Sequence, residues 1–197
     1  GSGDMETMGA RRKKQKVKKG PFEQIKTGLR WIFQIAAVIL IAYMLVFFWG
    51  QPRTNVGQAM ETTLSGGDRV LINTLSYRFG TPKRGDLISF KPNGNKKAQS
   101  LIRRVIGLPG ETIQIVDGVI YINGRVYMEE QDFPAMTFFG TAKDEIVLGN
   151  SEYFVLGDNR NNSEDSRSAD IGNVRLSDIE GKVWFVIAPR SHFGLVE

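Results

Sequence analysis

The first hydrophobic pattern along the chain is an uninterrupted apolar stretch over residues 31–49. It contains no charged residue, and Gln34 is its only strongly polar side chain. As a helix this stretch is about 28 Å long, close to the roughly 30 Å hydrocarbon core of a bilayer. Trp31 at one end, with Tyr43 and Trp49 towards the other, is typical of the aromatic belts at membrane interfaces. The pattern predicts a transmembrane helix over residues 31–49.

Two other interpretations of this stretch are weaker. A cleavable signal peptide has a shorter apolar region and a small-x-small cleavage site after it, and residues 47–52 (Phe-Phe-Trp-Gly-Gln-Pro) do not supply one. A core helix of a soluble protein is rarely apolar on every side. We therefore expect the segment to remain as a membrane anchor.

Beyond the anchor, the hydrophobic period changes to the alternation of β-strands. The clearest case is residues 113–128, three short apolar runs separated by Asp117-Gly118 and Asn123-Gly124. Both pairs favour two-residue type I′ turns, so this segment is predicted to be a three-stranded antiparallel meander. Further strands are predicted over residues 69–73, 86–90, 153–156 and 182–187.

These patterns predict a mostly β fold, in which an N-terminal transmembrane helix is followed by an antiparallel β-sheet domain over residues 50–197. The alternation weakens between about residues 123 and 150, and this segment is predicted to be a smaller β insertion. The chain has no cysteine, so we expect the domain to fold without disulfides.

The charge of the chain is concentrated in its N-terminal tail. The net charge is +5. Residues 11–19 hold seven lysines and arginines and only Asp4 and Glu6 precede them, so residues 1–19 carry +5 and residues 20–197 have no net charge. A nucleic-acid-binding protein more often carries basic residues on a folded surface, and we expect no nucleic-acid partner. Such a tail is either a solvated arm or the positive-inside signal of the helix that follows, which also attracts anionic lipid.

We adopt the second interpretation, which orients the protein. Residues 1–30 are then a cytoplasmic basic tail, and residues 50–197 are extracytoplasmic. Residues 1–4 (Gly-Ser-Gly-Asp) resemble the scar of an expression tag and are left out of the functional argument.

Three segments of the predicted β domain carry the candidate chemistry. They are Gly-Gln-Ala-Met-Glu-Thr-Thr-Leu at 57–64, Arg-Arg-Val-Ile-Gly-Leu-Pro-Gly-Glu at 103–111, and Gly-Asp-Asn-Arg-Asn-Asn-Ser-Glu-Asp-Ser-Arg at 157–167. In this order after an apolar helix, they resemble the signature boxes of bacterial type I signal peptidase of the single-span type. The resemblance covers roughly residues 31–190, and its third segment is highly specific. It implies a membrane-bound serine endopeptidase that removes signal peptides from exported preproteins with a serine nucleophile and a lysine base, without a cofactor.

Both reacting positions of that family hold other residues in this chain. Ala59 stands at the serine position, and alanine has no group that attacks a carbonyl. Arg103 stands at the lysine position, where a base must lose its proton near neutral pH; arginine stays protonated and has no acceptor lone pair. The main-chain N–H of position 59, which the family uses in its oxyanion hole, is retained. The resemblance therefore implies a catalytically inactive variant.

The resemblance also assigns supporting roles. Ser163 corresponds to the hydroxyl that orients the base, and Met60 either helps to bury the site or packs in the core. A run of this composition alone is more often a polar surface loop, but three boxes in order favour a scaffold beneath the site. The ion-paired scaffold residues are expected to be Asp158, Arg160, Asp165 and Arg167.

Other candidate residues gain less support. His192, the single histidine, lies beyond the last predicted core strand and does not match the position of the base. Phe138-Phe139 either enters the membrane or fills the core of the insertion. No cluster of histidine and carboxylate residues has the spacing of a metal site.

The expected partners are signal peptides of secretory preproteins, the lipid bilayer and the protein-export machinery. Two explanations of the replaced dyad stay open. The chain is either an engineered enzyme that can trap its substrate, or a natural non-catalytic membrane protein of the same fold that binds signal peptides or partner subunits.

Overall fold

The computed structural model describes residues 20–196. The basic residues 11–19 and the tag-like residues 1–4 lie outside this range. The chain divides into two compact units, with the boundary between Ala42 and Tyr43.

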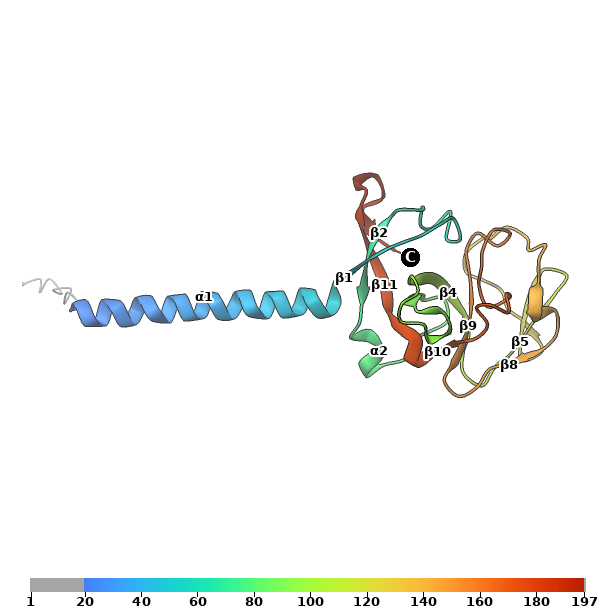
Figure 1. Ribbon diagram of the computed structural model, residues 1–197, viewed down its shortest axis with the longest axis horizontal. Helices are drawn as coiled ribbons and strands as arrows, with labels where there is room; N and C mark the ends of the chain where they lie inside the picture. The colour runs from blue at the N-terminus through green and yellow to red at the C-terminus, as the bar shows by residue number, and fades with distance from the viewer. Residues whose placement is uncertain (1–19, 197) are drawn as a thin grey trace, which may run out of the picture. The chain divides into compact units, whose positions relative to one another are not determined.

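Helix α1, Pro21–Trp49, contains the predicted anchor and begins before it (Figure 1). Gly20 O accepts the N–H groups of Glu23 and Gln24 at 3.0 and 3.2 Å. Pro21 suits the first helical position because an N–H group there would have no partner, and the acidic Glu23 complements the helix dipole. Polar residues of the first turns thus extend the helix ahead of its apolar part.

The C-terminal end of α1 follows from Gly50 and Pro52. Gly50 N–H still bonds Val46 O at 2.7 Å, and the chain then enters a strand. Among the described residues α1 alone is long and apolar enough to cross a membrane, over Pro21–Val46.

Within residues 20–196, the larger sheet has eight strands in the order β1-β2-β11-β3-β4-β9-β10, with β12 beside β11, and its strand pairs are antiparallel. The strands are β1 Gln51–Thr54, β2 Arg69–Asn73, β3 Leu87–Phe90, β4 Leu101–Gly107, β9 Glu152–Leu156, β10 Val174–Arg175, β11 Ile179–Ala188 and β12 Gly194–Leu195.

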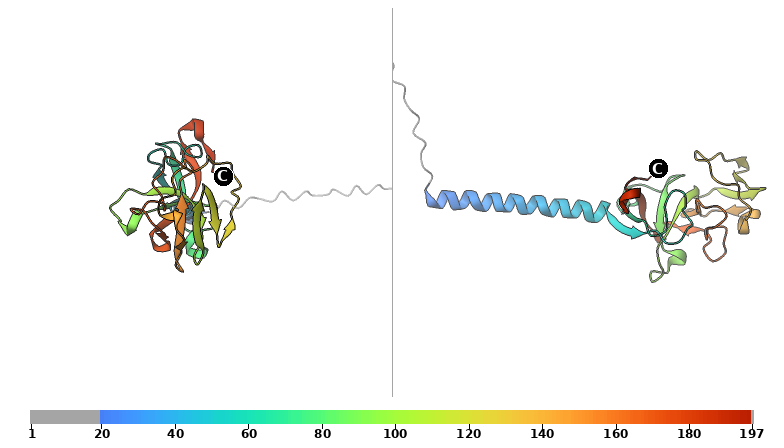
Figure 2. Two further views of the ribbon diagram at one scale, coloured as in Figure 1. Left: turned by 90° about the vertical axis from the view of Figure 1, so that its right-hand side faces the viewer. Right: turned by 90° about the horizontal axis from the view of Figure 1, so that it is seen from above.

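The smaller sheet has the order β7-β6-β5-β8, and it lies at the opposite end of the β domain from β2 and β11 (Figures 1 and 2). Its strands are β5 Thr112–Val116, β6 Val119–Ile122, β7 Arg125–Val126 and β8 Ile146–Val147. Asp117 and Gly118 have φ of 50° and 80°, and Asn123 and Gly124 have 52° and 75°, as type I′ turns require. The mostly β, antiparallel fold and the meander predicted from the sequence are confirmed.

Short helical turns connect the strands. They are α2 Ser76–Phe79 and the 3₁₀ turns η1 Pro92–Gly94, η2 Gly140–Lys143, η3 Leu176–Asp178 and η4 Arg190–His192.

Strand β4 is central to the packing of the domain. Ile106 belongs to the core between the two sheets, Ile102 to a core with Met60, and Val105 to a third core with Tyr153. Because β4 packs on both faces, its charged residues are buried whichever way they point. This is why Arg103 and Arg104 are both buried, although alternation places them on opposite faces.

Candidate active site

The first of the three segments forms a tight turn after β1. Ala59 is 7% exposed, and Met60 is fully buried among the core residues that pack on β4. Met60 O accepts the N–H groups of Thr63 and Leu64 at 2.9 and 2.8 Å, which closes the turn. The position of Ala59 is thus fixed by core packing of the residue that follows it.

The third segment is hydrogen-bonded to this turn. Asn159 N–H donates to Ala59 O at 2.9 Å, and Asn159 Nδ2 donates to Gln58 O at 3.0 Å. Asn162 Nδ2 donates to Gln58 Oε1 at 3.2 Å. Two segments about 100 residues apart in sequence therefore meet at Ala59.

Gly157 brings Ser163 to the same place. A Cβ atom on Gly157 would overlap the Ser163 hydroxyl and would lie 2.6 Å from Ala59 O. Only glycine leaves room for this contact. The Ser163 Oγ atom is buried and has no hydrogen-bond partner among the described residues. A buried hydroxyl without a partner is unfavourable, and such groups are often found at functional sites.

Arg103 does not bond that hydroxyl. Its side chain is almost fully buried, and it donates from Nε to Glu164 O at 2.7 Å and from Nη1 to Ile102 O at 2.6 Å. Burial lowers the pKa of Arg103, and the negative charges of Asp165 and Glu164 oppose that shift. A guanidinium nevertheless stays protonated in proteins, and it has no lone pair to accept a proton.

A buried ion pair lies beneath the turn. Arg104 donates from Nε and Nη2 to the two carboxylate oxygens of Asp158 at 2.8 and 2.7 Å, and from Nη1 to Gly85 O at 3.0 Å. Asp158 Oδ2 also accepts the Thr63 hydroxyl at 2.5 Å. The pair therefore links β4 to both the first and the third segments.

A second buried pair joins Asp165 and Arg167. Arg167 donates from Nε and Nη2 to the Asp165 carboxylate at 2.9 and 2.7 Å, and from Nη1 to Phe138 O at 2.9 Å. Asp165 Oδ2 accepts Gly157 N–H at 3.0 Å. The last scaffold residue, Arg160, pairs with Glu129, a residue that lies between β7 and η2.

The structure thus brings Ala59 and Ser163 together and places Asp158, Arg160, Asp165 and Arg167 in buried ion pairs. Sequence reasoning missed two partners in these pairs. The signal that could have found Arg104 is its place beside Arg103, as a second cation in the second segment. Glu129 had no local signal, because its pairing depends on the tertiary fold.

Of the remaining candidates, His192 bonds a different carboxylate, whereas Phe138 touches this network through its main-chain oxygen, which accepts Arg167 Nη1. His192 Nδ1 is 2.9 Å from Asp68 Oδ1. Phe139 packs on the core between the sheets, whereas Phe138 is exposed, so the two phenylalanines do not act as one unit. Within residues 20–196, no group of three or more histidine or carboxylate residues is arranged to hold a metal ion.

Residues 28–188 match the family model described as signal peptidase, peptidase S26. The chain belongs to the signal peptidase family. It is 32% identical over 180 residues to a probable signal peptidase I-1 of Synechocystis, covering 88% of each chain. It is 33% identical over 187 residues to signal peptidase IB of Staphylococcus aureus, covering 85% of this chain and 93% of the relative.

A solved structure of a signal peptidase I from Enterococcus faecalis is 34% identical and covers 51% of this chain and 95% of its own, with a TM-score of 0.39. Family membership rests on the sequence matches rather than on this superposition. The family resemblance predicted from the three segments is confirmed.

Proposed function

We propose that this signal peptidase family member has the active-site architecture of a serine endopeptidase with both reacting groups replaced. Ala59 occupies the nucleophile position, Arg103 the base position, and Ser163 is the hydroxyl that orients the base. With Ala59 and Arg103 in place, the chain binds the end of a signal peptide but does not cleave it.

The observation that carries this proposal is the unpaired Ser163 hydroxyl beside the main chain of Ala59. A hydroxyl held there without a partner is what remains when the amine that it would bond is absent. Arg103, the nearest candidate for that amine by resemblance, instead donates to two main-chain carbonyls.

The chemistry of the parent reaction explains why both replacements matter. A serine oxygen at position 59 attacks the carbonyl carbon of the scissile bond while a lysine amine at position 103 takes its proton. The main-chain N–H of position 59 stabilises the oxyanion. The leaving amine then takes the proton from the lysine, and water releases the acyl group by the same route. Ala59 removes the attacking atom, and Arg103 removes the proton acceptor.

We further propose that α1 anchors the protein in the bacterial plasma membrane with its N-terminus in the cytoplasm. The support is one apolar helix of adequate length after a basic tail. The β domain then faces the compartment in which signal peptides of exported preproteins emerge, beside the export machinery.

The test restores the reacting groups. Ala59→Ser, Arg103→Lys and the double variant are assayed in detergent with a preprotein that has an Ala-x-Ala cleavage site. We expect cleavage at that site from the double variant alone. Loss of a serine protease nucleophile costs on the order of 10⁶ in turnover, and losing its base as well adds little.

A matched control combines Arg103→Lys with Ala135→Ser, which adds a hydroxyl at an exposed position. Ala135 O accepts Asn161 Nδ2 of the third segment at 3.0 Å, so the added hydroxyl lies near that segment but not at the nucleophile position. This control should stay inactive. Cleavage by Ala59→Ser alone would show that Arg103 is not at the base position, and a folded double variant that does not cleave would refute the proposal.

A further inference from the structure

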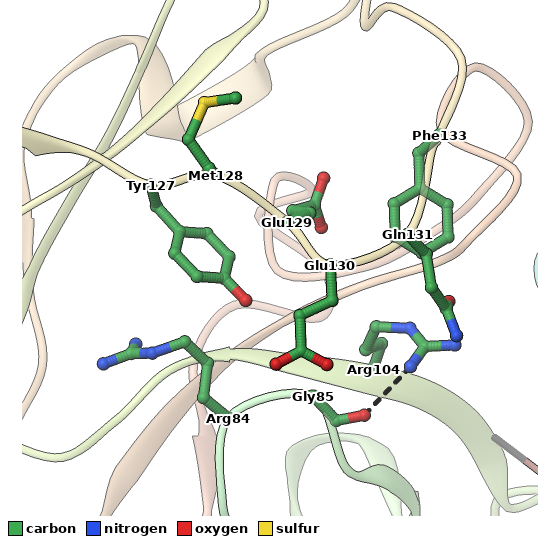
Figure 3. A pocket seen from close by; sticks show the side chains of 9 residues that line it. All are labelled: Arg84, Gly85, Arg104, Tyr127, Met128, Glu129, Glu130, Gln131 and Phe133. Carbon is green, nitrogen blue, oxygen red and sulfur yellow. Dashed lines mark hydrogen bonds between the residues drawn. The ribbon is translucent and has the colours of Figure 1, made fainter.

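A cavity of about 770 Å³ lies between Arg104 on β4 and the segment that follows β7 (Figure 3). Phe133 and Glu129 contribute to its wall. Glu129 also pairs with Arg160, and its side chain is 16% exposed. It therefore connects the smaller-sheet region to the candidate site.

The contact between Glu129 and Arg160 is bidentate. Arg160 Nη1 lies 2.6 Å from Glu129 Oε2, and Nη2 lies 2.5 Å from Oε1. The Arg160 side chain is 1% exposed, and its guanidinium carbon lies 4.1 Å from the centre of the Phe133 ring. A cation this deeply buried depends on its carboxylate partner.

Arg160 also holds the main chain of the third segment at Gly157. Its Nε donates to Gly157 O at 3.0 Å, while Gly157 N–H donates to Asp165 Oδ2 at 3.0 Å. The peptide groups on both sides of Gly157 are thereby fixed, and Gly157 is the residue packed against the Ser163 hydroxyl and Ala59 O.

We propose that Glu129 is a positioning residue that acts through Arg160 to hold Gly157, and with it the spacing of Ser163 and position 59. This inference rests on the proposed function, because the spacing matters only if those positions react. Glu129 touches no reacting atom. Its removal should disturb the geometry of the reaction rather than substrate affinity, since Glu129 lies outside the Ala59 turn.

The main experiment uses the full chain with Ala59→Ser and Arg103→Lys as the parent. Adding Glu129→Gln keeps the shape of the side chain but removes the charge. We expect kcat to fall on the order of 10- to 100-fold with KM unchanged, the range expected for a small misplacement of reacting groups. Glu129→Asp, which keeps the carboxylate, should recover most of that loss.

Glu111→Gln is the matched control. Glu111 makes a bidentate pair with Arg84 at 2.8 Å, its side chain is also 16% exposed, and its contacts are with Leu108 N–H and Arg84 rather than with Gly157. It should leave kcat unchanged. Equal losses of kcat in Glu111→Gln and Glu129→Gln would overturn the inference, as would full activity of Glu129→Gln.

A second measurement does not need an active enzyme. This measurement uses the chain that keeps Ala59 and Arg103. Amide hydrogen exchange of residues 157–163 should become faster in Glu129→Gln and stay the same in Glu111→Gln. Faster exchange with no cleavage by the parent would refute the proposed function and leave the contact established. Unchanged exchange would refute the positioning role. If Glu129→Gln does not fold, Glu129→Asp, whose shorter side chain cannot keep both bonds to Arg160, should still lower kcat and speed exchange more than Glu111→Asp does. Equal values in the two aspartate variants would overturn the inference.

Discussion

The ion-paired scaffold of the candidate site and the positions proposed for the reaction differ in how their polar groups are satisfied. Each charged scaffold side chain has a bidentate partner, in the pairs Arg104–Asp158, Arg167–Asp165 and Arg160–Glu129. At the positions proposed for the reaction, Ala59 has no polar side chain and Arg103 donates to two main-chain oxygens, while the Ser163 hydroxyl has no partner among the described residues. The support of the site therefore does not depend on the groups that would react.

Two neighbouring arginines on β4 show this difference at one point in the sequence. Arg104 donates to both carboxylate oxygens of Asp158, whereas the hydrogen bonds of Arg103 within residues 20–196 go to main-chain oxygens. Both are buried. We therefore expect Arg104 to contribute more to the stability of the scaffold than Arg103 does.

The largest effect on stability is expected from Arg104→Met. It leaves Asp158 buried without its cation, which should lower the free energy of unfolding by about 3–5 kcal/mol. Arg103→Met removes a buried cation that has no bound carboxylate, and it should change the same quantity by no more than about 1 kcal/mol. Chemical denaturation of the full-length protein in detergent measures both. Similar losses in the two variants would show that the scaffold and the reacting positions are not energetically distinct.

A smaller effect is expected within the third segment, from two serines. Ser166 Oγ accepts Val155 N–H at 2.9 Å, so Ser166→Ala leaves a buried donor unpaired and should cost about 1–3 kcal/mol. Ser163→Ala removes a hydroxyl that has no partner, and it should be neutral or stabilising by up to about 1 kcal/mol.

Thermal unfolding of the two serine variants against the parent chain decides between these outcomes. A clear destabilisation by Ser163→Ala would mean that the hydroxyl already has a hydrogen-bond partner, which contradicts the proposal that it lacks the amine of a lysine. In the double variant with restored reacting groups, Ser163→Ala should instead reduce kcat, because the introduced lysine amine then hydrogen-bonds that hydroxyl.

The sequence predicted the fold well where the signal was local. The Asp117-Gly118 and Asn123-Gly124 turns require positive φ, and the strands on either side of them form as expected. Helix α1 begins at Pro21, ahead of the apolar segment 31–49, because its first turns are polar and depend on Gly20 and Pro21 rather than on hydrophobicity.

The candidate site was less predictable. Its three segments were recognisable as motifs, but the partners of Asp158 and Arg160 come from β4 and from the region after β7. No periodicity or spacing in the sequence brings Glu129 to Arg160. The unpaired state of Ser163 likewise exists only once Gly157 and Ala59 are packed around it.

The smallest effect is expected from an ion pair outside the scaffold, Arg84–Glu111. Burial alone would raise the pKa of Glu111, but hydrogen bonds from Arg84 and Leu108 N–H hold it below its ordinary value. A carboxyl with a depressed pKa in the folded state stabilises the protein above its unfolded pKa of about 4.3, and that stability is lost as the pH falls through the folded pKa. Glu111→Gln should therefore lower stability at pH 7 by no more than about 1 kcal/mol, and the difference from the parent should shrink at pH 3. Melting temperatures at the two pH values measure this, and a difference that stays constant would mean that the pair contributes packing rather than charge.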